Sequence, residues 1–174
     1  MFERTLADFH FQRWLEHRPE SERPHTVAHA RQLALSHGDL TAAAALLLEL
    51  GDAAAAESRL LAEPGRIDGN HYNTLVPLAK ALRAQERPRA ETVVYRALLT
   101  GILGRAYARA YGHAARYWSR LRDIADGGIS LLPLQSHEDF EAEIRARHRR
   151  KAAFWAYVNG KRRDRHHDVD PPIG

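Results

Sequence analysis

The chain has 174 residues, 44% of them hydrophobic and 28% charged, which is typical of a globular protein with one hydrophobic core. It has no cysteine, so disulfide bonds, cysteine-ligated zinc and a cysteine nucleophile are excluded. The net charge is +4, and the excess lies in the last fifth of the chain: residues 1–139 hold 17 basic and 17 acidic side chains, and residues 140–174 hold nine and five.

Helical signals recur along the chain and strand signals do not. Alanine, leucine, arginine and glutamate dominate, and no long stretch alternates apolar and polar residues. We expect helices at residues 2–17 and 25–36, separated by a break at residues 18–24 that contains two prolines. Glycine–aspartate pairs at residues 38–39 and 51–52 then predict tight turns, because glycine can end a helix and aspartate can cap the next one.

These turns predict short helices at residues 40–50 and 53–62. A further helix is expected at residues 71–85, with Pro77 kinking it or marking a break. Pro88 suits the first turn of the next helix. Apolar residues then recur every three or four positions up to Ala125, and the glycines among them predict a turn between Leu103 and Gly112. The apolar face predicts one shared core of Tyr95, Leu98, Leu99, Ile102, Tyr117 and Leu121.

The end of the chain is predicted to contain one more helix. Ser136 begins a capping box, and helix is expected from there to Val158, with Phe140, Ile144, His148 and Phe154 or Trp155 on its buried side. Residues 161–174 are basic and nearly without aliphatic side chains, so we expect a disordered tail that burial cannot order. Residues 1–160 then form a single helical domain.

Short helices in antiparallel succession predict an all-α fold. We expect an antiparallel helical-hairpin array, a tetratricopeptide-like right-handed solenoid. A 34-residue register places Ala90, Ala97 and Gly112 on the small-residue positions of that repeat, whereas its tryptophan, tyrosine and proline do not fall into place.

Three stretches carry a resemblance to a known family. They are residues 68–72 with Leu75 and residues 78–79, residues 95–99 with 111–117, and residues 144–151 ending in Phe154-Trp155. Together they resemble the C-terminal helical region of an uncharacterised bacterial family, related to helical tails of some proteins with SWIM-type zinc fingers. The resemblance covers residues 2–158. Members of that family are usually longer, which leaves a short paralogue and a fragment as two interpretations. The resemblance implies no activity, and the lack of cysteine here means that no zinc role is implied.

Two groups of polar residues are candidates for an interaction surface. Tyr111, His113 and Arg116 suit an anion site, proton transfer or a polar seam between helices, and we favour the seam. Arg147, Arg150 and Lys151 share a face that Trp155 extends, which suits phosphate binding or a solvated helix with Trp155 docked in the core, and we favour the latter.

Nothing in the sequence specifies a reaction. His25 and His29 lie four residues apart without an evident third metal ligand, and no phosphate loop, GxSxG or HExxH motif is present. We therefore expect no cofactor and no metal. The leading hypothesis is a non-enzymatic helical scaffold that binds protein; the alternative is a nucleic-acid-binding module that uses the basic C-terminal helix and tail. The first residues lack the apolar run of a signal peptide, and residues 40–50 are too short an apolar run to span a bilayer, so a cytoplasmic protein is expected by elimination.

Overall fold

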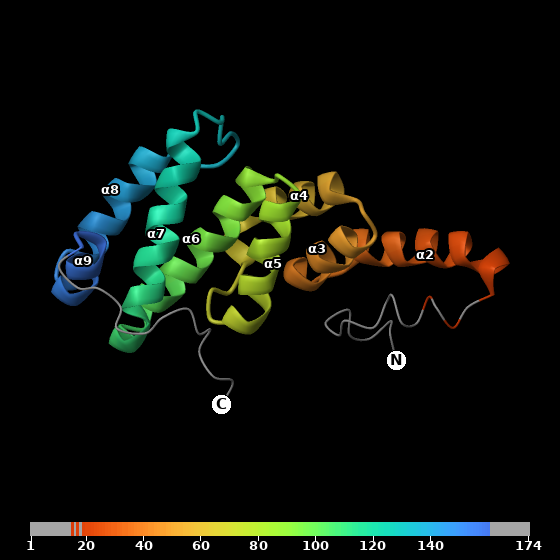
Figure 1. The fold of residues 1–174 in the computed structure, drawn as a ribbon, viewed down its shortest axis with the longest axis horizontal. Coiled ribbons are helices and arrows are strands. Elements are labelled where there is room, and N and C mark those ends of the chain that lie inside the picture. The colour runs from red at the N-terminus through yellow and green to blue at the C-terminus, as the bar shows by residue number, and fades with distance from the viewer. Residues whose placement is uncertain (1–14, 16, 18, 161–174) are drawn as a thin grey trace.

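The computed structural model describes residues 15, 17 and 19–160, and this part of the chain is all-helical, with no strand. The expected helix at residues 2–17 and the expected tail at residues 161–174 fall outside the described residues. Within these described residues, eight α-helices follow one another along an elongated body, from α2 at one end to α8 and α9 at the other (Figure 1). No helix in the described ranges is long and apolar enough to cross a membrane.

The first three helices begin and end close to the predicted positions. They are α2 (Arg23–Ser36), α3 (Leu40–Glu49) and α4 (Ala53–Ala62). The carboxylate of Asp39 accepts hydrogen bonds from the amides of Thr41 and Ala42, and that of Asp52 accepts one from Ala55, so both aspartates cap the helices that they precede. Gly51 between them has a φ of 77°, the left-handed conformation that ends a helix.

The middle of the chain forms three longer helices: α5 (Tyr72–Ala84), α6 (Pro88–Gly104) and α7 (Tyr111–Asp126). Pro77 lies inside α5 and is exposed, and the helix runs through it, so of the two predicted alternatives the break is wrong and the kink stays a prediction. The turn expected between Leu103 and Gly112 is confirmed: α6 ends at Gly104, and Ala106 takes a φ of 55°.

The last predicted helix is two helices, α8 (His137–His148) and α9 (Ala152–Val158), so the expectation of one helix to Val158 is wrong. The chain turns at residues 149–151 and α9 packs back against α7. The side chain of Phe154 is thereby fully buried, with its ring 6.1 Å from that of Trp118 on α7. Burial of this ring outweighs continuation of the helix, because one large apolar side chain contributes about 1.5–3 kcal/mol.

The apolar interior is divided into two clusters, which we call the N-terminal core and the C-terminal core. The N-terminal core joins α2 to α6 and includes Leu98; the C-terminal core joins α6 to α9 and includes Leu99, Ile102 and Leu121. The prediction of one shared core is therefore wrong, although each of these four residues is buried. Tyr95 and Tyr117 are half-buried and stack at 5.3 Å where the two cores meet.

Arginines of α6 hold the long loop between α7 and α8. Arg96 donates to the carbonyl oxygens of Gln135 and Ser136 at 3.0 and 3.2 Å, and Arg89 donates to that of Leu132. Burial lowers the pKa of Arg96 to about 10, with Glu143 opposing the shift. These contacts fix the start of α8, where the Ser136 hydroxyl accepts from the amide of Asp139 as the capping box predicts.

Candidate functional site

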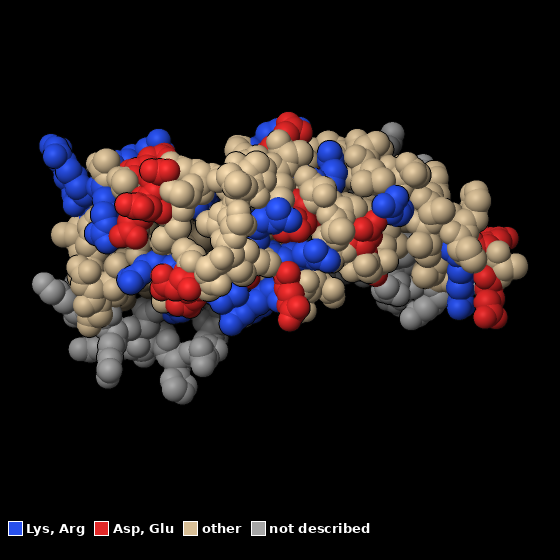
Figure 2. Space-filling model, turned by 90° about the horizontal axis from the view of Figure 1, so that it is seen from above, with Lys and Arg blue, Asp and Glu red and all other residues tan. Residues whose placement is uncertain are grey.

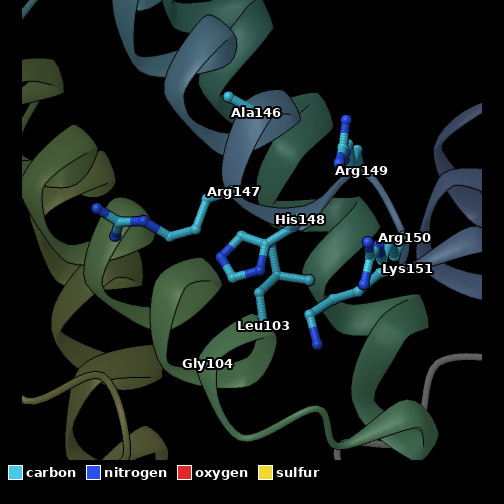
Figure 3. Close-up of a pocket in the computed structure, with 8 residues that line it drawn as sticks. All are labelled: Leu103, Gly104, Ala146, Arg147, His148, Arg149, Arg150 and Lys151. Atoms are coloured by element: carbon cyan, nitrogen blue, oxygen red, sulfur yellow. The ribbon is translucent and has the colours of Figure 1, made fainter.

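A concavity lies where α8 turns into α9. It has a volume of about 570 Å³ and faces the end of α6. Figure 3 shows His148 at its centre, above Leu103 of α6, with Arg150 and Lys151 on the side of the turn and Arg149 directed away from the imidazole. We call it the elbow pocket; it is lined by Leu103, Gly104, Ala146, Arg147, His148, Arg149, Arg150 and Lys151.

Positive charge dominates the elbow pocket, because no acidic side chain lines it. Arg147 is paired with Glu143 on the same helix at 2.9 Å. Arg149, Arg150 and Lys151 form no ion pair with any residue in the described part of the chain. Three full positive charges at the pocket are thus left without a carboxylate among the described residues.

His148 is the one titratable side chain of the pocket that is buried, with 8% of its surface exposed. Its Nε2 is buried and has no hydrogen-bond partner among the described residues. Burial lowers the pKa of His148, and the charges of Lys151 and Arg147 lower it further. The imidazole is therefore neutral at neutral pH while it sits among cations.

Trp155 contributes to the elbow from behind and not as part of the basic face. Its indole Nε1 donates to the carbonyl oxygen of His148 at 3.0 Å, which ties α9 to the end of α8. Its ring meets that of Trp118 edge to face at 5.4 Å, and the guanidinium of Arg145 lies 4.9 Å above it. The half-buried Trp155 is thus a structural clamp of the pocket wall.

The other predicted surface residues lie elsewhere. Tyr111 is only 5% exposed and packs edge to face against Phe154, which fits the favoured seam between helices and not an accessible surface. Arg116 is exposed, donates to Nδ1 of His113 at 2.8 Å and lines a smaller depression of about 270 Å³ between α7 and α9. The seven predicted residues therefore do not form one surface: three line the elbow pocket, and Arg149 and His148 complete it.

Two buried carboxylates, Glu91 and Glu57, were not predicted from the sequence. Glu91 is 1% exposed and binds Arg120 of α7 through both oxygens, at 2.7 and 3.0 Å. Glu57 of α4 is also buried and binds Arg89, with Arg87 at 3.7 Å. Both pairs join residues about 30 positions apart in sequence, 32 for Glu57 with Arg89 and 29 for Glu91 with Arg120, so no local spacing indicates them. Each carboxylate forms an ion pair with its arginine, and each ion pair joins two helices.

The described residues offer no group of three or more histidine, cysteine or acidic side chains placed to hold a metal ion. His25 and His29, the pair considered from the sequence, are both exposed on α2. 

Comparison with known proteins places the chain in a family without assigning it a chemistry. No curated protein and no solved structure matches it. The SWIM-type zinc-finger relationship and the bacterial origin, both suggested by resemblance, stay predictions. One family model matches residues 1–157, nearly the whole chain. The chain belongs to a family of unknown function, DUF6880.

Proposed function

We propose that the protein is a non-enzymatic helical scaffold that binds another protein along its helix array. The observation that carries the proposal is the packing of most helices on a neighbour in sequence and on the next helix but one. The pairs α2–α3, α3–α4, α5–α6 and α6–α7 are in contact, and so are the alternate pairs α3–α5, α4–α6 and α7–α9. Stacked helical hairpins have this pattern, and such arrays serve as extended binding surfaces.

The finer form of the proposal is the tetratricopeptide-like right-handed solenoid expected from the sequence. The connections between α2 and α3, α3 and α4, and α5 and α6 are three residues long, which favours antiparallel neighbours. Charge supports a protein partner for the body of the array: Figure 2 shows acidic and basic side chains intermingled along the face that it presents. A mixed surface of this kind repels a polyanion as much as it attracts it.

A second candidate, nucleic-acid binding, rests on the elbow pocket. Arg149, Arg150 and Lys151 are the cations that a phosphate backbone would meet there. The C-terminal basic residues 161–174, which lie outside the described part of the chain, belong to the same hypothesis.

Affinity capture with the full chain from native lysate, with and without nuclease, tests both candidates. For a protein scaffold, the same proteins are retained in both arms. They are also retained by a variant with alanine at residues 149, 150 and 151, because the array and not the elbow binds them. Loss of all retained material on nuclease treatment, or in that variant, contradicts the scaffold and favours nucleic acid. If the chain retains nothing that an unrelated helical protein does not also retain, both candidate functions are contradicted.

A further inference from the structure

We propose that the elbow pocket binds the phosphate group of a small phosphorylated molecule. This goes beyond the scaffold proposal, since the pocket lies at one end of the array and is not needed for binding along it. Three observations carry the inference: a cavity of ligand size, three cations without carboxylate partners among the described residues, and a buried imidazole nitrogen without a hydrogen-bond partner there.

The cavity volume of about 570 Å³ is within the range of about 300–1,000 Å³ usual for small-molecule sites. Its walls come from two separate parts of the chain. Leu103 and Gly104 at the end of α6 form an uncharged wall, and residues 146–151 form the basic one. Because Trp155 and Lys151 both hydrogen-bond to the carbonyl oxygen of His148, the basic wall is held in place before any ligand arrives.

The charges decide the class of ligand. Two helix ends, of α6 at Gly104 and of α8 at His148, face the pocket, and each contributes about half a negative charge. Arg147 is neutralised by Glu143. The three remaining cations exceed the two helix ends by about two charges, which matches a phosphate dianion. Neutralising the two helix ends therefore does not account for all three cations.

The same surroundings favour a compact ligand over a long polyanion. The three cations are consecutive in sequence, and along α8 the next side chains include Glu141 and Glu143. Both arginines of α8, Arg145 and Arg147, are paired with these carboxylates, so the helix offers a nucleic-acid backbone no further unpaired cation. A single phosphate group meets only the pocket.

Histidine-selective NMR of the full chain tests the proposal, with inorganic phosphate and pyrophosphate as probes. Phosphate should shift the ring signals of His148 and raise its pKa, because a bound dianion offsets the charges of Lys151 and Arg147, which together with burial lower it; the α6 wall carries no charged side chain. The exposed His25 should not respond. If the ring signals of His148 stay unshifted at phosphate concentrations of tens of millimolar, which would saturate a site with a Kd of about 1 mM, the proposal is wrong.

Isothermal titration with matched variants locates the site. The R149A/R150A/K151A variant should bind pyrophosphate at least about tenfold more weakly, because each charge-assisted contact contributes about a factor of ten. The control R66A/R83A/R109A removes the same charge from exposed arginines that do not line the pocket, and it should bind as the unchanged chain does. If both variants lose the same affinity for pyrophosphate, the loss reflects net charge alone and the proposed site is wrong.

Two further arms keep the outcome decisive. If the triple-alanine variant does not fold, R149Q/R150Q retains polar side chains at the turn and should show the same loss; unchanged binding contradicts the proposal. A single-stranded DNA oligonucleotide should compete for the elbow pocket no better, per phosphate group, than pyrophosphate does. Much tighter binding of the oligonucleotide, lost in the same variant, would assign the elbow to nucleic acid and refute a small-molecule site.

Discussion

Replacing Gly69 with alanine should destabilise the fold, because the turn before α5 lies directly on the backbone of α6. A Cβ at Gly69 would lie 1.8 Å from the carbonyl oxygen of Ala97 and 2.5 Å from its carbonyl carbon, whereas ordinary van der Waals contact begins at 3.4 Å. Both atoms belong to the interior of a helix, so no flexible side chain can move aside. Turn and helix must separate by more than an ångström.

The expected loss follows from two opposing effects. Overpacking of this kind costs about 1–3 kcal/mol or more. Alanine returns about 0.4–1 kcal/mol by restricting the unfolded chain. The net loss in the free energy of unfolding is then about 2 kcal/mol, which lowers the melting temperature by roughly 4–8 °C for a chain of this size. Urea unfolding followed by far-ultraviolet circular dichroism measures it.

Gly65 supplies the matched control, since a Cβ there has no atom within 4 Å and its φ is not left-handed. Gly65→Ala should change stability by no more than about 0.5 kcal/mol. Gly101→Ala adds a second arm: alanine favours a helix by about 1 kcal/mol, but its Cβ would lie 2.8 Å from the backbone of Gly69. If Gly69→Ala is as stable as Gly65→Ala, or if Gly101→Ala is stabilising, the close contact is refuted.

Four further outcomes are expected. Glu86 follows the end of α5 with a φ of 53°, so Glu86→Gly should raise stability by about 0.5–1 kcal/mol in thermal unfolding, and no gain would contradict strain at that turn. Arg120→Ala leaves the carboxylate of Glu91 buried and unpaired and should cost about 3–5 kcal/mol in urea unfolding, whereas Glu91→Leu combined with Arg120→Leu should cost less. Leu98→Ala should cost about 2–5 kcal/mol, and a loss below about 0.5 kcal/mol would refute its place in the core. Burial lowers the pKa of His137, so the folded state binds fewer protons than the unfolded chain once the pH falls below about 6.5. Stability therefore declines from there toward the lowered pKa, and His137→Gln should reduce the decline of the urea midpoint between about pH 7.5 and 5.5.

Local signals in the sequence were sufficient for most of the helix boundaries. Asp39 and Asp52 cap helices as their positions indicate, and Pro88 begins α6. These features depend on residues within four positions of one another. The boundary between α8 and α9 has no such signal, because residues 137–158 contain neither glycine nor proline. It is set by the burial of Phe154 against α7, which only the assembled fold provides.

The candidate site was partly predictable for the same reason. Arg147, Arg150 and Lys151 were grouped by the 100° spacing of a continuous helix, and they do lie together. That spacing placed Arg149 on another side, but α8 ends at His148, so the spacing no longer applies and Arg149 joins the pocket. The pairing of Glu91 with Arg120 connects residues 29 positions apart and leaves no local pattern to find.

The division of the interior into two cores has a consequence for cooperativity. Two successive residues of α6 lie on different faces of the helix, with Leu98 in the N-terminal core and Leu99 in the C-terminal core. Both halves of the protein pack against this one helix. Unfolding of one half therefore exposes an apolar face of the helix that the other half needs. We therefore expect the two halves to unfold as one cooperative unit, and a cut on either side of α6 to leave one half with an unfilled core.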